Sequence, residues 1–147
     1  LALARFQGVK RRMEILASCE DYVIYDDFAH HPTEIFKTLS SLREKIGNDQ
    51  IIALIEPRSR TMQSGLHDKE MAKALSPADS VIWYEGQDVK RSMSAELKKA
   101  KAEVYFAANI SEIIQITRQI KTTKSNIVIM SNGDFSGLRE LIKKELD

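Results

Sequence analysis

The sequence predicts an α/β fold: a three-layer, Rossmann-like domain with a mostly parallel sheet of about six strands and an N-terminal antiparallel hairpin. Two observations predict it. Short apolar runs rich in β-branched residues recur along the chain, and most are too apolar for half-exposed strands. Segments with helical spacing lie between these runs, and strands that alternate with helices indicate parallel strands joined by right-handed crossovers.

The first elements are a hairpin and a long helix. In "KRRMEILASCEDYVIYDD" the turn-like "SCED" separates two strand-like runs. A helix is expected over Pro32–Ile46, because Pro32 suits its first turn and Gly47 its end. Its apolar face consists of Ile35, Leu39, Leu42 and Ile46.

The later elements alternate. Strands are expected in "IIALIE" at Ile51, "SVIWYE" at Ser80, "EVYFAA" at Glu103 and "NIVIMS" at Asn126. Helices are expected at 69–75, 93–100, 110–120 and 135–146. The core-facing positions of the last helix are expected to be Leu138, Leu141, Ile142 and Leu146. Trp83 and Tyr84 are expected to pack at the end of a buried strand.

Composition excludes several classes of function. The 147 residues carry a net charge of +1 and are 43% hydrophobic, which is typical of one soluble globular domain. Basic and acidic residues are mixed, so no nucleic-acid partner is expected. The single cysteine, Cys19, excludes an internal disulfide and a Cys-based zinc cage. With no signal peptide or membrane span in view, we expect a cytoplasmic protein without a membrane partner, and the start at Leu1 indicates a domain cut from a longer protein.

Polar residues follow the expected strands, at positions 26–31, 56–61, 85–86 and 131–133. The carboxyl ends of parallel strands line one edge of a sheet, and ligands bind in the crevice outside it. In the first segment, Asp27 can accept hydrogen bonds from a ribose, and His30 can donate to an oxyanion or hold a carboxylate. The alternative is that Asp27 or His31 only caps the helix. A zinc site is disfavoured, because adjacent histidines do not easily face one ion.

The other two segments also allow two interpretations. Arg58 and Arg60 suit recognition of a carboxylate or phosphate, or they are solvated surface arginines. "SNGDFSG" is either a backbone cradle for a ligand or a turn in which Gly133 supplies a positive φ. No GxxxxGK[ST] or GxGxxG motif occurs, so any nucleotide phosphates must be held by another domain.

Two motifs in this order and spacing resemble a known family. "FQGVKRRME" followed by "YDDFAHHPTEI" is similar to the start of the C-terminal domain of the Mur ligases, ATP-dependent enzymes that attach amino acids or peptides to UDP-N-acetylmuramate. The double histidine resembles the branch that acts on UDP-N-acetylmuramate itself. Within it, "EPRSRTM" and "IMSNGDFSG" resemble the members that add the recycled murein tripeptide L-Ala-γ-D-Glu-meso-diaminopimelate. Arg60 departs from these members and resembles the L-alanine-adding ones instead.

The resemblance covers residues 1–147 and implies that the three domains of the enzyme bind different substrates. ATP phosphorylates the muramoyl carboxylate to an acyl phosphate, which the amine of the peptide attacks. ATP and Mg²⁺ are held mainly by a central P-loop domain and the UDP-sugar by an N-terminal domain, both absent from this chain. The C-terminal domain closes over ATP and presents the amine substrate, so the isolated chain is expected to be inactive. The alternative from another class is a stand-alone metabolite-binding module with the same fold.

The resemblance also implies roles for individual residues. Arg12 matches the arginine that reaches the ATP phosphates, and Asp27 matches the aspartate that binds the ribose. His30 lies where the family loop approaches ATP and the amine, which makes it the candidate catalytic residue. The residues implied in substrate binding are Arg58, Ser59, Thr61, Ser131, Asn132 and Gly133. No metal ligand is implied.

Overall fold

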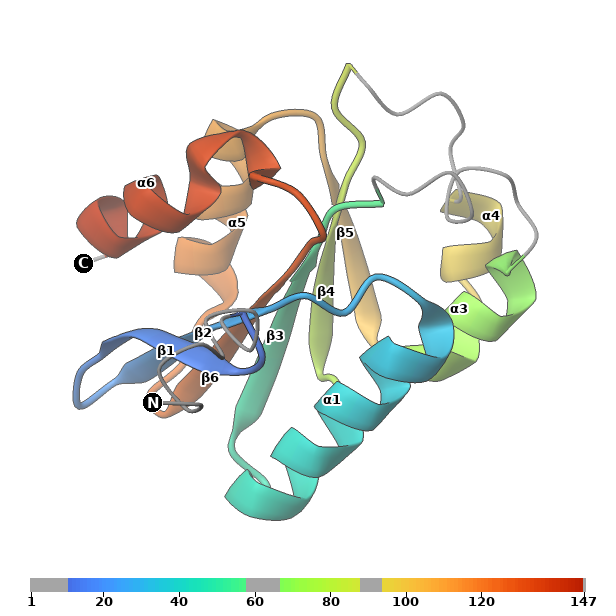
Figure 1. Cartoon of the computed structure of the whole chain (residues 1–147), viewed down its shortest axis with the longest axis horizontal. Helices are drawn as coiled ribbons and strands as arrows, with labels where there is room; N and C mark the ends of the chain where they lie inside the picture. The colour runs from blue at the N-terminus through green and yellow to red at the C-terminus, as the bar shows by residue number, and fades with distance from the viewer. Residues whose placement is uncertain (1–10, 58–66, 88–93, 147) are drawn as a thin grey trace, which may run out of the picture.

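The computed structural model describes residues 11–57, 67–87 and 94–146. Within them, six strands form one sheet between two layers of helices (Figure 1). The strands are β1 (Glu14–Ser18), β2 (Tyr22–Asp27), β3 (Gln50–Ile55), β4 (Ser80–Tyr84), β5 (Glu103–Ala107) and β6 (Ser125–Met130). The α-helices are α1 (Pro32–Ile46), α3 (Asp68–Ala74), α4 (Ser94–Leu97), α5 (Ile110–Ile120) and α6 (Leu138–Glu145). Among the described strands, only β1 pairs antiparallel, with β2, so the predicted fold class and hairpin are confirmed.

The two helical layers bury separate cores. On one face of the sheet, α1, α3 and α4 pack against side chains such as Ile51, Val81 and Val128. On the other face, α5 and α6 pack against the alternate positions, such as Ile52 and Ile127. Figure 1 shows the two groups of helices on opposite sides of the sheet. Because both faces are covered, β3 and β6 are apolar almost throughout, as the sequence predicts.

The strand order places three carboxyl ends side by side. The order is β1-β2-β6-β3-β4-β5, so the last strand of the chain lies between β2 and β3. In this register Met130 is opposite Asp27 on one side and Ile55 on the other. The strand order therefore reverses at β6, and such a switch point is where an open α/β sheet forms a ligand crevice.

Helix α1 forms as predicted. Ile35 and Leu39 are fully buried and Leu42 nearly so. Gly47 follows the helix with φ 64°, and its N–H donates to the carbonyl of Arg43. His31 stands at the N-cap but makes no capping hydrogen bond with its side chain, so it does not serve as the side-chain cap.

The last helix differs from the prediction at its start. A 3₁₀ turn at Phe135–Gly137 precedes α6, and the backbone is left-handed at Phe135, Ser136 and Gly137, with φ of 54°, 49° and 75°. This kink accompanies the complete burial of the Phe135 ring. The interpretation of "SNGDFSG" as a turn with a positive φ at Gly133 is therefore wrong at that residue, because the positive φ angles lie at Phe135, Ser136 and Gly137.

The core face of α6 is narrower than predicted. Leu138, Ile142 and Leu146 are buried, but Leu141 is 39% exposed, so its predicted core position is wrong. The three buried residues are four positions apart and form one stripe along the helix, and Leu141 lies to one side of it.

The other predicted elements need small adjustments. The helix expected at 69–75 is α3, and the one expected at 93–100 is described only over α4. The helix at 110–120 and the complete burial of Trp83 are confirmed, and Tyr84 packs partly buried beside the core. Cys19 lies exposed in the hairpin loop. No helix among the described residues has the length and apolar character needed to cross a membrane.

Arg43 ties the end of α1 to the loops before β3 and β4. Its guanidinium donates to the carbonyls of Pro77, Gly47 and Asp49 at 3.1, 2.8 and 2.7 Å, and to the Asp79 carboxylate at 2.7 Å. Asp79 also accepts from the N–H of Ile51 at the start of β3. One side chain therefore donates hydrogen bonds to three backbone carbonyls at this corner.

Replacing Arg43 by Ala should lower the free energy of unfolding by about 1–3 kcal/mol, because partly buried carbonyls lose a charged donor. Urea unfolding followed by circular dichroism measures the change. Lys98→Ala, on an exposed residue, is the control and should stay within about 0.5 kcal/mol of wild type. Equal stability of both variants would show that the Arg43 contacts are not maintained in solution.

Candidate functional site

The candidate site lies at the adjoining carboxyl ends of β2, β6 and β3. Asp26 and Asp27 end β2, Ser131 follows β6, and Glu56 follows β3. All four are buried, with exposed fractions of 6% or less. Buried polar groups need partners, so the bonding of each decides which atoms remain available to a ligand.

Asp27 is held on the α1 side of the sheet. Its Oδ2 accepts the N–H of Met13 at 3.0 Å, and its Oδ1 accepts the N–H of Ala29 at 2.9 Å and the hydroxyl of Thr38 at 3.4 Å. Burial raises the pKa of Asp27, although these donors and the nearby charge of Arg12 act in the opposite direction. With two lone pairs on each oxygen, Oδ2 can accept one further hydrogen bond.

Arg12 and Asp27 line the same hollow, which has a volume of about 390 Å³. Lys37 and Lys45 of α1 line it as well. The structure thus brings together Arg12 and Asp27, two of the three residues expected to bind ATP, and adds two lysines that sequence reasoning missed. The third, His30, is not among the described residues that line this hollow. Three cationic side chains beside one acceptor match the charge pattern of a nucleotide, with its anionic phosphates and its hydroxyl-bearing ribose.

Asp26 has a different role on the opposite face. Its carboxylate lies between Arg139, at 2.8 Å, and Arg11, at 3.3 Å. Arg11 also donates to the carbonyls of Ser131 and Gly133. Desolvation and the neighbouring Arg139 lower the pKa of Arg11, while Asp26 partly offsets the effect. Arg11 therefore joins the start of the described chain to the loop after β6.

Ser131 is oriented inward. It is completely buried, its hydroxyl donates to Glu56, and its oxygen accepts the N–H of Gly133 at 2.9 Å. The side chain expected to bind substrate thus links the ends of β3 and β6 in this structure. Any contact with a ligand in this conformation falls to its neighbours in the loop.

Asn132 is the neighbour with unused hydrogen-bonding capacity. Its Oδ1 is buried yet has no hydrogen-bond partner within the part of the chain that the structure describes. A buried acceptor without a donor costs about 1–3 kcal/mol, which an incoming N–H or O–H would recover. This atom is therefore a binding candidate on physical grounds as well as by its place in the sequence.

The three histidines of the sequence lie close together. The rings of His30 and His31 are 4.7 Å apart, and His67, at the start of α3, is 5.9 Å from His31. Nδ1 of His30 lies 3.0 Å from the carbonyl of Phe28, so the tautomer that donates this bond leaves Nε2 as an acceptor. Among the described residues, no group of three or more His, Cys, Asp or Glu is arranged to hold a metal ion. The approach of His67 to His31 was not foreseen, because only the α1–α3 packing brings them together.

The other predicted binding residues cannot be placed. Arg58, Ser59 and Thr61 lie outside the described residues, as does Arg60. Their roles remain predictions from the sequence.

The raised pKa of Asp27 predicts the sign of a pH effect. An aspartate in an unfolded chain has a pKa of about 3.9, and burial raises the pKa of folded Asp27 above this value. Between the two values the folded state binds more protons, so the contribution of Asp27 to stability grows as pH falls through its folded-state pKa and is lost as pH rises. We expect wild type to gain stability relative to Asp27→Asn on acidification from about pH 7 to about pH 4. Urea unfolding of both proteins at each pH tests this, and a relative loss for wild type would contradict it.

Comparisons with known proteins agree with this geometry. A family model described as "Mur ligase, glutamate ligase domain" matches residues 11–133. The UDP-N-acetylmuramate–L-alanyl-γ-D-glutamyl-meso-2,6-diaminoheptandioate ligase of Haemophilus influenzae is 34% identical over 146 residues, which are 99% of this chain and 32% of that protein. The UDP-N-acetylmuramate–L-alanine ligase of a Streptococcus agalactiae serotype Ia strain is 49% identical over 139 residues, or 90% of this chain and 30% of that protein.

A solved structure shares the fold. The crystal structure of a murein peptide ligase from Psychrobacter arcticus superposes with a TM-score of 0.83 and 33% sequence identity, covering 93% of this chain and 30% of that one. This chain spans about a third of the length of the curated relatives that it matches. From the matched residues, the sheet and the hairpin together, the chain belongs to the Mur ligase family and corresponds to its C-terminal domain.

Proposed function

We propose that this chain is the C-terminal domain of an ATP-dependent ligase that joins the murein tripeptide L-Ala-γ-D-Glu-meso-diaminopimelate to UDP-N-acetylmuramate, in peptidoglycan recycling in the cytoplasm. The H. influenzae and P. arcticus relatives support this assignment. The "SNGDF" loop after β6 supports it further. An N-terminal UDP-binding domain and a central P-loop domain would complete the enzyme.

The observation that carries the proposal is the buried Oδ1 of Asn132, which has no hydrogen-bond partner among the described residues and lies within the loop that the resemblance assigns to substrate. Amide-bond formation requires that an amine be held and oriented before it attacks an activated carboxyl group. An N–H of the incoming peptide would satisfy this acceptor. The hydrogen bond from Ser131 to Glu56 fixes the start of this loop.

The proposed nucleotide contacts belong to the hollow beside α1. Arg12 would reach the ATP phosphates there, and Oδ2 of Asp27 would accept one ribose hydroxyl. ATP with Mg²⁺, held mainly by the central domain, supplies the phosphoryl group that activates the muramoyl carboxylate. The contribution of this chain is to bind, orient and exclude water when it closes on that domain.

A second candidate is the L-alanine-adding ligase, favoured by the 49% identity to the S. agalactiae protein. Arg60 also favours it, because the tripeptide-adding members are expected to have asparagine there. A stand-alone metabolite-binding module is the candidate from another class. It requires tight ligand binding by this chain alone, whereas the ligase proposal requires the central domain for ATP binding.

The full-length ligase that contains this domain should form product from ATP and UDP-N-acetylmuramate with the tripeptide and not with L-alanine. The pocket for the amine substrate must satisfy the several carboxylates of the tripeptide, whereas L-alanine carries one. The test is to supply the tripeptide and L-alanine in parallel assays and to measure phosphate release and the mass of the product with each. Turnover of L-alanine alone would establish the second candidate, and activity with neither would favour the non-enzyme module.

In the same enzyme, Asp27→Asn should raise the KM for ATP by about tenfold, the cost of one hydrogen bond to a charged acceptor. The KM for UDP-N-acetylmuramate should stay unchanged. Asp21→Asn, on an exposed residue of the hairpin loop, removes the same charge and is the control. Unchanged ATP kinetics for Asp27→Asn would remove the ribose assignment, and equal losses for both substrates would make Asp27 a structural residue only.

A further inference from the structure

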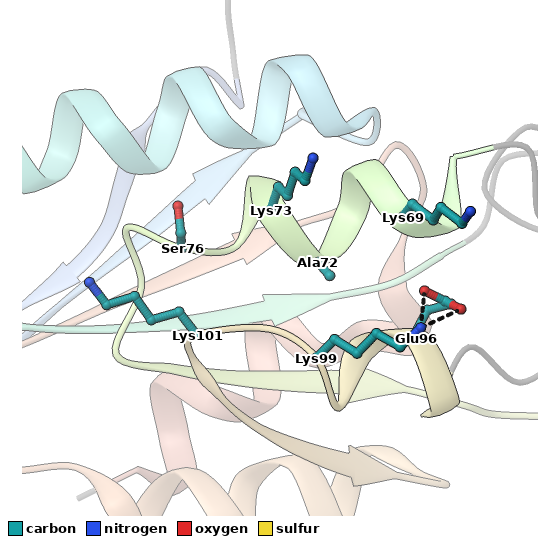
Figure 2. Close-up of a pocket in the computed structure, with 7 residues that line it drawn as sticks. All are labelled: Lys69, Ala72, Lys73, Ser76, Glu96, Lys99 and Lys101. Carbon is teal, nitrogen blue, oxygen red and sulfur yellow. Dashed lines mark hydrogen bonds and ion pairs between the residues drawn. The ribbon is translucent and has the colours of Figure 1, made fainter.

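A second basic hollow lies away from the candidate site. It has a volume of about 490 Å³ and is lined by α3, the loop after α3, α4 and the segment that leads from α4 into β5. Lys69, Lys73, Lys99 and Lys101 all line it (Figure 2). The strand order places β4 and β5 at the opposite end of the sheet from the hairpin, so this hollow is separate from the one that contains Asp27. Its volume falls within the range of small-molecule sites, about 300–1,000 Å³.

The charge of this hollow is poorly balanced. Glu96 is the acidic residue in the described lining, and it pairs with Lys99 at 3.2 Å. Lys69, Lys73 and Lys101 make no ion pair with the described residues. Lys69 and Lys73 are four residues apart on α3, where like charges cost about 0.2–0.5 kcal/mol in helix stability. This repulsion destabilises α3, a helix of only seven residues. An anion bound between the two lysines would relieve it.

The arrangement of the lysines indicates the shape of the anion. Figure 2 shows that the four side chains do not converge on one point. Lys69 and Lys99 extend toward the end of the hollow beside Glu96, Lys101 extends toward the other end, and Lys73 extends from the side of α3 that faces away from α4. Separated cations suit an elongated ligand with several charges better than a single small ion. Ala72 is buried between them on α3, which leaves the middle of the hollow without a competing side-chain charge.

The type of cation indicates the chemistry of the ligand. The cations that the structure describes in the lining are lysines. Lysine acts as a point charge that suits phosphate oxygens. We propose that this hollow is a second ligand site, which takes a small, elongated anion with two or more phosphate groups. The proposal does not depend on the ligase assignment, because it uses none of the residues of the candidate site.

Inorganic tripolyphosphate is the probe, titrated into the 147-residue chain at about 0.1 M salt and followed by backbone amide NMR. We expect saturable shifts at Ala72, Ser76 and Lys99, and weaker binding as salt increases. The variant Lys73→Gln/Lys101→Gln should raise the Kd by about tenfold or more. Lys98→Gln/Lys144→Gln removes the same charge from exposed residues outside the hollow and should change the Kd by less than about twofold.

Several outcomes would overturn the proposal. Shifts centred on Arg12 and Asp27 would place the anion in the other hollow. Equal losses in the two double variants, or shifts that do not saturate at about 10 mM, would show general attraction to positive charge rather than a site. Citrate, which carries carboxylates only, should bind more weakly than tripolyphosphate, and equal affinity would overturn the phosphate assignment. Since the four substituted lysines are exposed, thermal unfolding of each variant without ligand should match wild type and so exclude misfolding.

Discussion

Two adjacent buried carboxylates at the end of β2 impose the constraint on which the candidate site depends. Successive residues of a strand point to opposite faces, so Asp26 and Asp27 must be compensated separately. Asp26 meets Arg11 and Arg139, and Asp27 accepts the N–H of Met13 among its donors. A buried charge that loses its partner costs about 3–5 kcal/mol. Segments before β1, after β2 and in α6 are therefore bound to one point of the sheet.

At two strand ends, neighbouring residues have different roles. Arg11 is used internally, whereas Arg12 is exposed beside the hollow at α1. Ser131 is likewise bonded within the protein, whereas Oδ1 of Asn132 has no partner among the described residues. In each pair one side chain fixes the backbone and the next remains available. For the proposed binding groups, Arg12 and Asn132, this arrangement would combine a fixed backbone with free hydrogen-bonding capacity, which is what preorganisation requires.

Much of the fold could be predicted because its signals are local. The face of α1 and its Pro32 and Gly47 boundaries depend on spacing and backbone preference within one segment. The kink that buries Phe135, and the exposure of Leu141, depend on how the last turn meets the sheet, which no local pattern encodes. In the candidate site, too, features set by local signals could be predicted and those set by distant contacts could not. That polar residues gather at one edge follows from the alternation of strands and helices. That Ser131 turns inward follows from its contact with Glu56, a residue 75 positions away.

The position of β6 has a consequence for synthesis. Residues 125–130 form the strand between β2 and β3, although they are made after every other strand. Until they leave the ribosome, β2 and β3 each present an unpaired, strongly apolar edge, the kind of surface that associates with other chains. The sheet of the nascent domain thus remains open at its centre until residues 125–130 emerge, and it becomes continuous only then.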